Sequence, residues 1–428
     1  MNFMASAIGK LLFLKKLGPG LITGAADDDP SGIATYSQAG AQFGFATLWT
    51  MLFAYPLVVA IQALSARIGL VTGRGIAANL RDYYPIPLTS FLVISLVAAN
   101  IVNIAADLAA MADVMELVLG GPSHLYAVGF GLLSVLLQIF VPYERYVRVL
   151  KWLTISLLAY GATVLIAHVP WREVLVDTLL PELELNPDYL AVVVGILGTT
   201  ISPYLFFWQA GLEVEELGAE PLRAALRHIP EHARAELWRV KLDTGIGMAF
   251  SGITAFFIML TAAATLHVYG IQDIQTSAQA AEALRPVAGE YAFALFSAGI
   301  VGTGMLAVPV LAGSAAYAVA DALNWKSGMS FKAGEAKGYY AVLGVATLLG
   351  VILDFTEISP MKLLLWSAMI NGVVAVPLMA AMVYLASQPE VMGRFTLTWR
   401  HKILSWTATA VMGLAVLALV FAQGKTYL

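Results

Sequence analysis

Residues 18–44 read GPGLITGAADDDPSGIATYSQAGAQFG, a largely apolar stretch interrupted by three consecutive aspartates and a proline. The length fits a membrane crossing, which takes about 20 apolar residues. One aspartate at the centre of a membrane helix costs about 2.5–3.5 kcal/mol, so three aspartates require water, a bound cation or protonation. Pro30 removes a backbone donor and clashes with the preceding helical turn. The stretch therefore predicts a membrane helix broken at Asp27–Gly32, where the non-helical backbone borders protein or water.

A second stretch, residues 192–216, is interrupted in the same way. It reads VVVGILGTTISPYLFFWQAGLEVEE, with glycines, a short polar segment and Pro203 near its middle. The two breaks fall in the first and sixth apolar spans of the chain, so the two halves would have opposite orientations in the membrane. Paired broken spans in inverted halves are typical of transporters, which bind their substrate near the bilayer midplane at this place.

The overall composition places the chain in lipid. Hydrophobic residues make up 59% and charged residues 12%, with a mean hydropathy of +0.79, whereas a soluble domain carries about 25% charged residues. The absence of cysteine excludes disulfides and thiolate metal sites. Apolar windows that predict about eleven spans lie at roughly 18–42, 45–70, 88–117, 123–142, 147–168, 190–216, 239–266, 291–321, 337–353, 360–386 and 403–423.

These windows predict an all-α membrane protein. We expect residues 1–428 to form a single transmembrane transporter domain, with inverted repeats at about 18–168 and 190–386 and an extra helix at about 403–423. No stretch resembles a soluble domain, and no nucleophile–base pair or His/Glu metal motif predicts an enzyme. We also expect no nucleic acid as a partner.

The distribution of positive charge predicts the orientation of the chain. With a cytoplasmic N-terminus, 20 of the 24 Lys and Arg residues fall on the cytoplasmic side, as the positive-inside rule requires. The four on the other side are Arg172, Arg285, Lys362 and Lys425. We therefore predict a multi-pass protein of the inner (plasma) membrane with its C-terminus outside.

The first break is a candidate site for a cation. Asp28 and Asp29 are the predicted metal ligands, because hard cations prefer carboxylate oxygens. Asp29 followed by Pro30 is also a strong signal for an N-cap and the first residue of a helix, so capping is an alternative role for Asp29. Capping does not explain Asp27 and Asp28.

The second break supplies hydroxyl and carbonyl oxygens at Thr199–Tyr204. Beside the two aspartates, the predicted substrate-binding residues are Ser31, Gly32, Thr200, Ser202 and Tyr204, and the predicted ion-pathway residues are Asp27, Asp107, Gln209 and Asn371. The half-helices that begin at the breaks also direct two N-termini at the same cavity, and helix N-termini favour anions. The residues alone thus leave open a cation or a small anion as the substrate.

The two breaks resemble those of the NRAMP divalent-metal transporters, which have a LeuT-like fold of 5+5 inverted repeats, and the likeness covers the whole chain. That family has Asp-Pro-Gly-Asn in its first helix, and Asp29-Pro30-Ser31-Gly32 occupies this place here. Its sixth-helix Met-Pro-His is replaced by Ser202-Pro203-Tyr204, and a second histidine falls at about Gln209. Its third-helix aspartate, which is tied to proton movement, corresponds to Asp107.

The departures from the family pattern bear on the substrate. The resemblance implies transport of a divalent metal, but without a thioether the site loses the physical basis for preferring soft metals. NRAMP-related magnesium transporters also lack the methionine. We therefore expect a secondary transporter of a hard divalent cation, Mg²⁺ or Mn²⁺, that works by alternating access. The alternative is a Na⁺- or H⁺-coupled transporter of a small anion such as bicarbonate. We expect no cofactor besides the transported or coupling cation, and a monomer or weak oligomer in the lipid bilayer.

Overall fold

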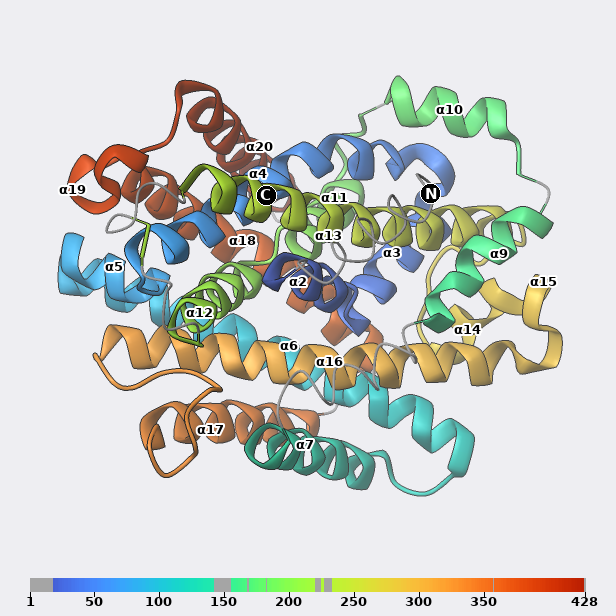
Figure 1. Ribbon diagram of the computed structural model, residues 1–428. Coiled ribbons are helices and arrows are strands. Elements are labelled where there is room, and N and C mark those ends of the chain that lie inside the picture. The colour runs from blue at the N-terminus through green and yellow to red at the C-terminus, as the bar shows by residue number, and fades with distance from the viewer. Residues whose placement is uncertain are drawn as a thin grey trace, which may run out of the picture.

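The computed structural model describes residues 18–141, 155–167, 169–181, 183–219, 225–226, 233–356 and 358–426, and all regular structure in these ranges is helical (Figure 1). Nine helical segments of this described part are long and apolar enough to cross a membrane. They are Trp49–Thr72, Ile86–Leu119, Ser123–Phe140, Pro187–Gly218, Ala233–His267, Ser277–Ala322, Lys337–Asp354, Pro360–Ala386 and Trp399–Gln423. The prediction of an all-α membrane protein is confirmed.

Most of these segments contain one long helix. The helices are α4 (Trp49–Thr72), α6 (Ile86–Leu119), α7 (Ser123–Phe140), α13 (Ala233–Ala262), α16 (Ala292–Ala322), α17 (Lys337–Asp354), α18 (Pro360–Ala386) and α20 (Trp399–Thr426). Their positions agree with the predicted windows, although α6 and α13 begin earlier than expected. The predicted span at 147–168 lies partly outside the described residues, which include α9 (Leu158–Ile166) from it.

The first and sixth spans are each broken into two helices, as predicted. The first consists of α2 (Pro19–Asp27) and α3 (Pro30–Phe43), which are separately too short to cross a membrane. The sixth consists of α11 (Pro187–Thr200) and α12 (Pro203–Ala219). In both spans a proline is the first residue of the second helix, where its fixed φ fits and its missing N–H leaves no bond unmade.

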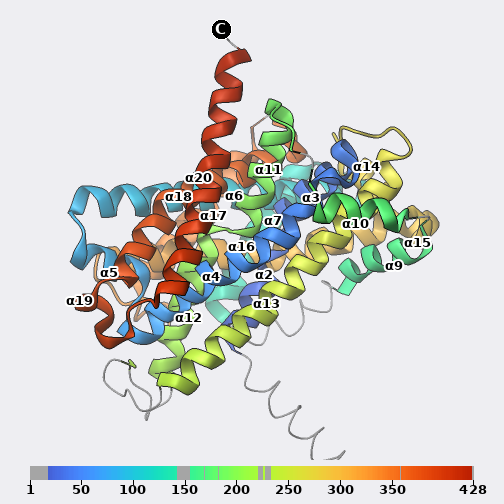
Figure 2. The same cartoon turned by 90° about the horizontal axis from the view of Figure 1, so that it is seen from above.

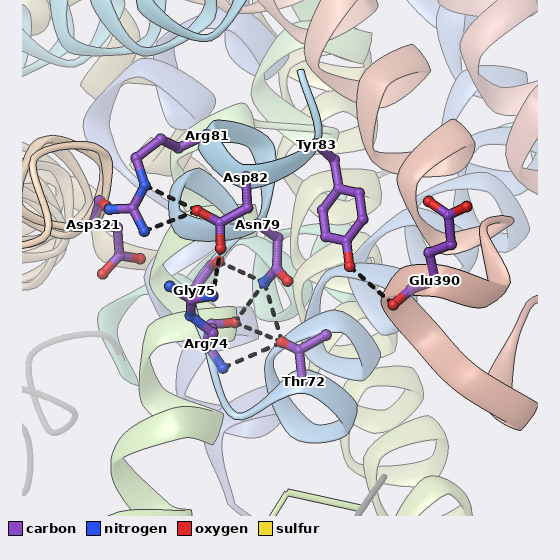
Figure 3. Close-up of polar contacts among 9 residues, drawn as sticks. All are labelled: Thr72, Arg74, Gly75, Asn79, Arg81, Asp82, Tyr83, Asp321 and Glu390. Carbon is purple, nitrogen blue, oxygen red and sulfur yellow. Dashed lines mark hydrogen bonds and ion pairs between the residues drawn. The ribbon is translucent and has the colours of Figure 1, made fainter. Parts of the chain in front are cut away.

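Short helices that the sequence did not predict connect the spans. They are α5 (Ile76–Tyr83), α10 (Trp171–Leu179), α14 (Ser277–Ala281), α15 (Arg285–Ala288) and α19 (Pro389–Met392). The amphipathic helix α5 is held to its neighbours by polar contacts (Figure 3). Arg81 donates to the backbone carbonyl of Asp321 in α16 at 2.9 Å, and Tyr83 donates to the carbonyl of Glu390 in α19 at 2.9 Å.

Asp82 forms ion pairs within the same local segment of the chain. Its carboxylate pairs with Arg74 at 2.5 Å and with Arg81 at 3.0 Å (Figure 3). Burial alone would raise the pKa of Asp82, but the hydrogen bonds and charges of the two arginines hold it below its ordinary value. The group is therefore a carboxylate at neutral pH. Its ion pairs brace the segment from Arg74 to Asp82, while Arg81 and Tyr83 connect α5 to α16 and α19.

The broken helices lie in the middle of the bundle and not at its edge (Figures 1 and 2). Both α2 and α3 pack on α13, while α3 and α11 pack on α18. The contact of α2 with α13 is unusually close, because a Cβ added to Gly24 would lie 2.3 Å from the backbone of Gly247. Gly20 and Gly24 form a small-xxx-small pair of the kind that lets membrane helices approach backbone to backbone.

Candidate substrate site between the two broken helices

Three carboxylates meet at the break between α2 and α3. Asp27, Asp28 and Asp29 are 1%, 3% and 1% exposed, so water reaches none of them in this conformation. No ion pair among the described residues includes any of the three. Buried carboxylates without a positive partner are costly, so a cation or protons must offset their charge.

Asp29 caps α3, as the alternative interpretation proposed. Its Oδ1 accepts a hydrogen bond of 2.6 Å from the backbone N–H of Gly32. Its Oδ2 faces the second broken span, where the Tyr204 hydroxyl lies at 3.3 Å and also reaches the carbonyl of Ala26 at 3.2 Å. Each carboxylate oxygen keeps a further lone pair, so capping and cation binding are compatible.

Asp27 and Asp28 share one hydroxyl from α13. The Ser251 Oγ lies 2.6 Å from Asp27 Oδ2 and 2.9 Å from Asp28 Oδ1. A hydroxyl has a single proton to donate, so it cannot fully satisfy two carboxylates. Asp27 Oδ1 has no hydrogen-bond partner in the described structure. Sequence reasoning missed Ser251, because a lone serine in an apolar helix carries no signal of its position.

The two breaks face one another. A Cβ on Gly32 would lie 3.1 Å from Thr199 Oγ1, so the two breaks approach closely at this point. The Tyr36 hydroxyl lies 3.1 Å from Thr200 Oγ1, which in turn donates to the carbonyl of Ile196 at 2.7 Å. The structure thus brings together Gly32, Thr200 and the aspartates, and adds Tyr36, which the sequence did not indicate.

Two predicted substrate-binding hydroxyls have bonds to the protein itself. Ser31 Oγ lies 3.0 Å from the carbonyl of Leu364 and 3.1 Å from Ser367 Oγ, both in α18. Ser202 Oγ bonds back to the carbonyls of Gly198 and Thr199 at 2.9 and 2.6 Å. Ser202 donates its proton to a backbone carbonyl, and Ser31 donates to the Leu364 carbonyl or to Ser367. Only lone pairs of these hydroxyls therefore remain to face a cation.

The predicted ion-pathway residues lie on the helices around the breaks. Asp107 in α6 is fully buried, and neither of its oxygens has a hydrogen bond of ordinary geometry. It is close enough to the first break for the charge of Asp29 and the backbone N–H of Ser31 to act on it. Asn371 in α18 is buried with an unpartnered Oδ1. Gln209 in α12 is instead engaged, because it accepts from Gln62 at 2.7 Å and donates to Thr244 at 2.8 Å.

The donors gathered at the breaks are oxygens. Within the described ranges no three His, Cys, Asp or Glu side chains are arranged to hold a metal ion. Any bound cation would therefore need carbonyls, hydroxyls or water beside two carboxylates, which is the coordination that small hard ions accept.

Contacts of α13 close one side of the site. The Asp243 carboxylate accepts from the backbone N–H groups of Gly20 at 2.8 Å and Leu21 at 3.1 Å, at the start of α2. One turn earlier, Arg239 pairs with Glu213 of α12 at 2.7 Å. These bonds hold the first turns of α2 and the end of α12 against α13, so the carboxylates stay shut off from this side.

Comparison with known proteins places this arrangement in a family. The chain is 29% identical over 303 residues to the divalent metal cation transporter MntH of Verminephrobacter eiseniae (strain EF01-2), an alignment that covers 69% of this chain and about two thirds (66%) of the relative. Its fold is similar to that of the Eremococcus coleocola manganese transporter, with a TM-score of 0.77 at 16% identity, covering 96% of this chain and 86% of the other. It is also similar to Mhp1, a nucleobase-cation-symport-1 family transporter, with a TM-score of 0.60 at 12% identity, covering 96% and 93%.

The resemblance that the two breaks indicate is confirmed over nearly the full length. At these identities the likeness to the solved structures concerns the fold alone. The family model of natural resistance-associated macrophage protein-like (Nramp) proteins matches residues 20–422. The chain therefore belongs to the Nramp family.

Proposed function

We propose that the chain is a secondary transporter that carries a divalent metal cation, Mn²⁺ among its substrates, by alternating access. The observation that supports this most is the group of three adjacent buried carboxylates, without an ion pair in the described structure, where two broken helices meet. The relatives named as divalent metal cation and manganese transporters support the same substrate class. Asp28 and Asp29 are the proposed ligands, with Asp27 and Asp107 on the ion pathway.

The all-oxygen site bears on which metal is carried. Carboxylates, hydroxyls and carbonyls suit Mg²⁺ and Mn²⁺, whereas a soft thioether or imidazole would favour later transition metals. Ser202 and Tyr204 stand where the family has a thioether and an imidazole, and Tyr204 offers Asp29 only a hydroxyl. We infer that Mg²⁺ and Mn²⁺ are both accepted and that Cd²⁺ has no advantage over them.

A small anion is a weaker candidate for the substrate. The converging N-termini of α3 and α12 would attract bicarbonate, but three carboxylates at the same place would repel it. Each ionised aspartate carries a full negative charge, whereas each helix N-terminus carries only about half a positive charge. The charges therefore favour a cation as the substrate, and the transport experiment below distinguishes it from a cation-coupled anion.

Flux in proteoliposomes tests the proposal. Purified protein would be reconstituted, and entry of Mn²⁺, Mg²⁺ and bicarbonate would be compared with and without Na⁺ and pH gradients, with empty liposomes as the control. We expect saturable Mn²⁺ entry that Mg²⁺ inhibits. Bicarbonate entry that depends on a cation, without any entry of Mn²⁺ or Mg²⁺, would contradict the proposal.

Ser251 gives a second test of the site. Replacing Ser251 by Ala removes the hydroxyl that bridges Asp27 and Asp28 and helps to orient them. We therefore expect the KM for Mn²⁺ uptake to rise about tenfold, as for the loss of a residue that orients a metal ligand. Ser251→Thr keeps the hydroxyl and is expected to recover most of the affinity. Equal KM values for wild type and Ser251→Ala would mean that this contact does not support the site.

We further infer the architecture and topology. Repeats at about 18–168 and 190–386 would be related by an in-plane axis, with the helix at 403–423 outside them. The distribution of Lys and Arg supports a cytoplasmic N-terminus and an outer C-terminus in the inner membrane. We also infer a monomer or weak oligomer in the lipid bilayer.

A further inference from the structure

A groove separate from the broken helices lies on the outer surface of the bundle. It has a volume of about 510 Å³ and runs between α4, α13 and α20. The helix α4 packs on both of the others and lies between them (Figure 2). Two of its lining side chains, Tyr55 and Trp238, are 39% and 60% exposed, so the groove opens at the surface. Its lining includes none of the carboxylates at the two breaks.

One end of this groove is basic. Its lining includes Arg67, Arg234, Lys241 and His401, and it includes no Asp or Glu. The charges of Arg67 and Lys241 both act on His401, so these three residues from three helices lie close together. Arg67 donates to the carbonyls of Phe395 and Thr396 at 2.7–3.1 Å, and no ion pair of the described residues includes it.

The helix α13 separates its basic residues onto two faces. Arg239 turns to the interior, where it pairs with Glu213 and Glu236. Arg234, Trp238 and Lys241 follow the spacing i, i+4, i+7, which places them on one face, and all three line the groove. Arg234 and Lys241 are exposed and have no ion pair in the described part of the chain. The groove thus concentrates positive charge that no described carboxylate neutralises.

The remainder of the groove is apolar and long. On α4 the lining extends from Arg67 back to Tyr55, a distance of about 18 Å along a helix. Its walls include Val59 and Leu64 of α4 and Leu404 of α20. Trp238 is 60% exposed beside the basic end, and exposed tryptophans favour the level of lipid headgroups.

The basic end lies at the cytoplasmic side that the charge distribution predicts. Arg67 is near the end of α4, while Arg234 and His401 are near the starts of α13 and α20. The starts of helices add positive partial charge there. Anionic headgroups of the cytoplasmic leaflet are attracted to such basic pockets between membrane helices.

We propose that this groove binds an anionic glycerophospholipid of the inner leaflet. The phosphate lies among Arg67, Arg234 and Lys241, and one acyl chain follows the apolar wall of α4 toward Tyr55. The combination of a charged end with about 18 Å of apolar wall matches one lipid better than a free anion, which would use only the basic end. The proposal is independent of which ion the carboxylate site carries.

Lipid binding to the purified full-length protein tests the proposal. Native mass spectrometry would measure the affinity for phosphatidylglycerol, for phosphatidylcholine of the same acyl chains, and for inorganic phosphate. We expect phosphatidylglycerol to bind most tightly. In the double variant Arg234→Gln and Lys241→Gln its affinity is expected to fall roughly tenfold to thirtyfold, since each basic residue near an anionic headgroup contributes severalfold.

Two further variants distinguish a specific lipid site from general attraction of lipids to surface charge. Lys326→Gln with Lys337→Gln removes two exposed charges from a loop and helix start outside the groove, and it should leave the affinity unchanged. Ala63→Phe fills part of the apolar groove without changing its charge, and it should weaken phosphatidylglycerol binding. Thermal unfolding would check that this variant is still folded. Equal losses in both double variants, equal binding of the two lipids, or equal binding of inorganic phosphate would each overturn the proposal.

Discussion

Replacing Asp29 by Asn is expected to abolish metal uptake while leaving the protein folded. Asparagine caps a helix about as well as aspartate, so the bond to the Gly32 N–H survives. The negative charge next to Tyr204 and Asp28 is lost, and with it one of two proposed carboxylate ligands. Since loss of residues that merely orient a metal ligand costs 10–100-fold, we expect Mn²⁺ uptake to fall by about a hundredfold or more.

Two comparison variants make this result specific. Asp29→Ala removes the cap as well as the charge, so it should also destabilise the protein, by about 1 kcal/mol. Asp113→Asn removes a partly exposed carboxylate from α6 and should transport normally. If Asp29→Asn transports like the wild type while Asp29→Ala unfolds, then Asp29 serves only as a cap and is not a ligand.

Replacing Gly24 by Val is expected to have the largest effect on stability. The first added carbon would lie 2.3 Å from the backbone carbonyl of Gly247, and backbone cannot move aside as a side chain can. Overpacking typically costs about 1–3 kcal/mol, and a clash with backbone lies at the upper end of this range. We expect a drop of several degrees in the thermal unfolding midpoint, and loss of Mn²⁺ uptake because α2 also positions Asp27 for Ser251.

The matched control lies on the partner helix. A Cβ on Gly252, in α13, meets no atom within 4 Å, so Gly252→Val tests only the change of residue in a membrane helix. Its unfolding midpoint should stay within about 2 °C of the wild type. Equal midpoints for the two variants would show that α2 does not depend on close contact with α13.

The spans and their breaks could be predicted from the sequence because a lipid bilayer allows few backbone structures to cross it. Windows of about 20 apolar residues have few alternative structures in a bilayer. Pro30 and Pro203 marked the second half of each broken span correctly. The short helices α5 and α10 were missed, because they are too short to cross a bilayer and depend on partners such as Asp321 that only the fold brings near.

The site was predictable only in part. The aspartates at the first break stood out, since charge in an apolar stretch is rare and expensive. Ser251, Tyr36 and Asp243 did not, because their roles depend on which helices pack on α2 and α3. Gly20 and Gly24 have the spacing of a close helix contact, but the sequence does not indicate which helix they contact. Their partner Gly247 is more than 200 positions away.

Anomalous X-ray scattering from crystals grown with Mn²⁺ tests the central claim most directly. The account predicts one manganese peak between the two breaks, within about 2.0–2.6 Å of a carboxylate oxygen of Asp28 or Asp29, and its loss in Asp29→Asn. A manganese peak elsewhere in the bundle, in a protein that still transports Mn²⁺, would contradict it.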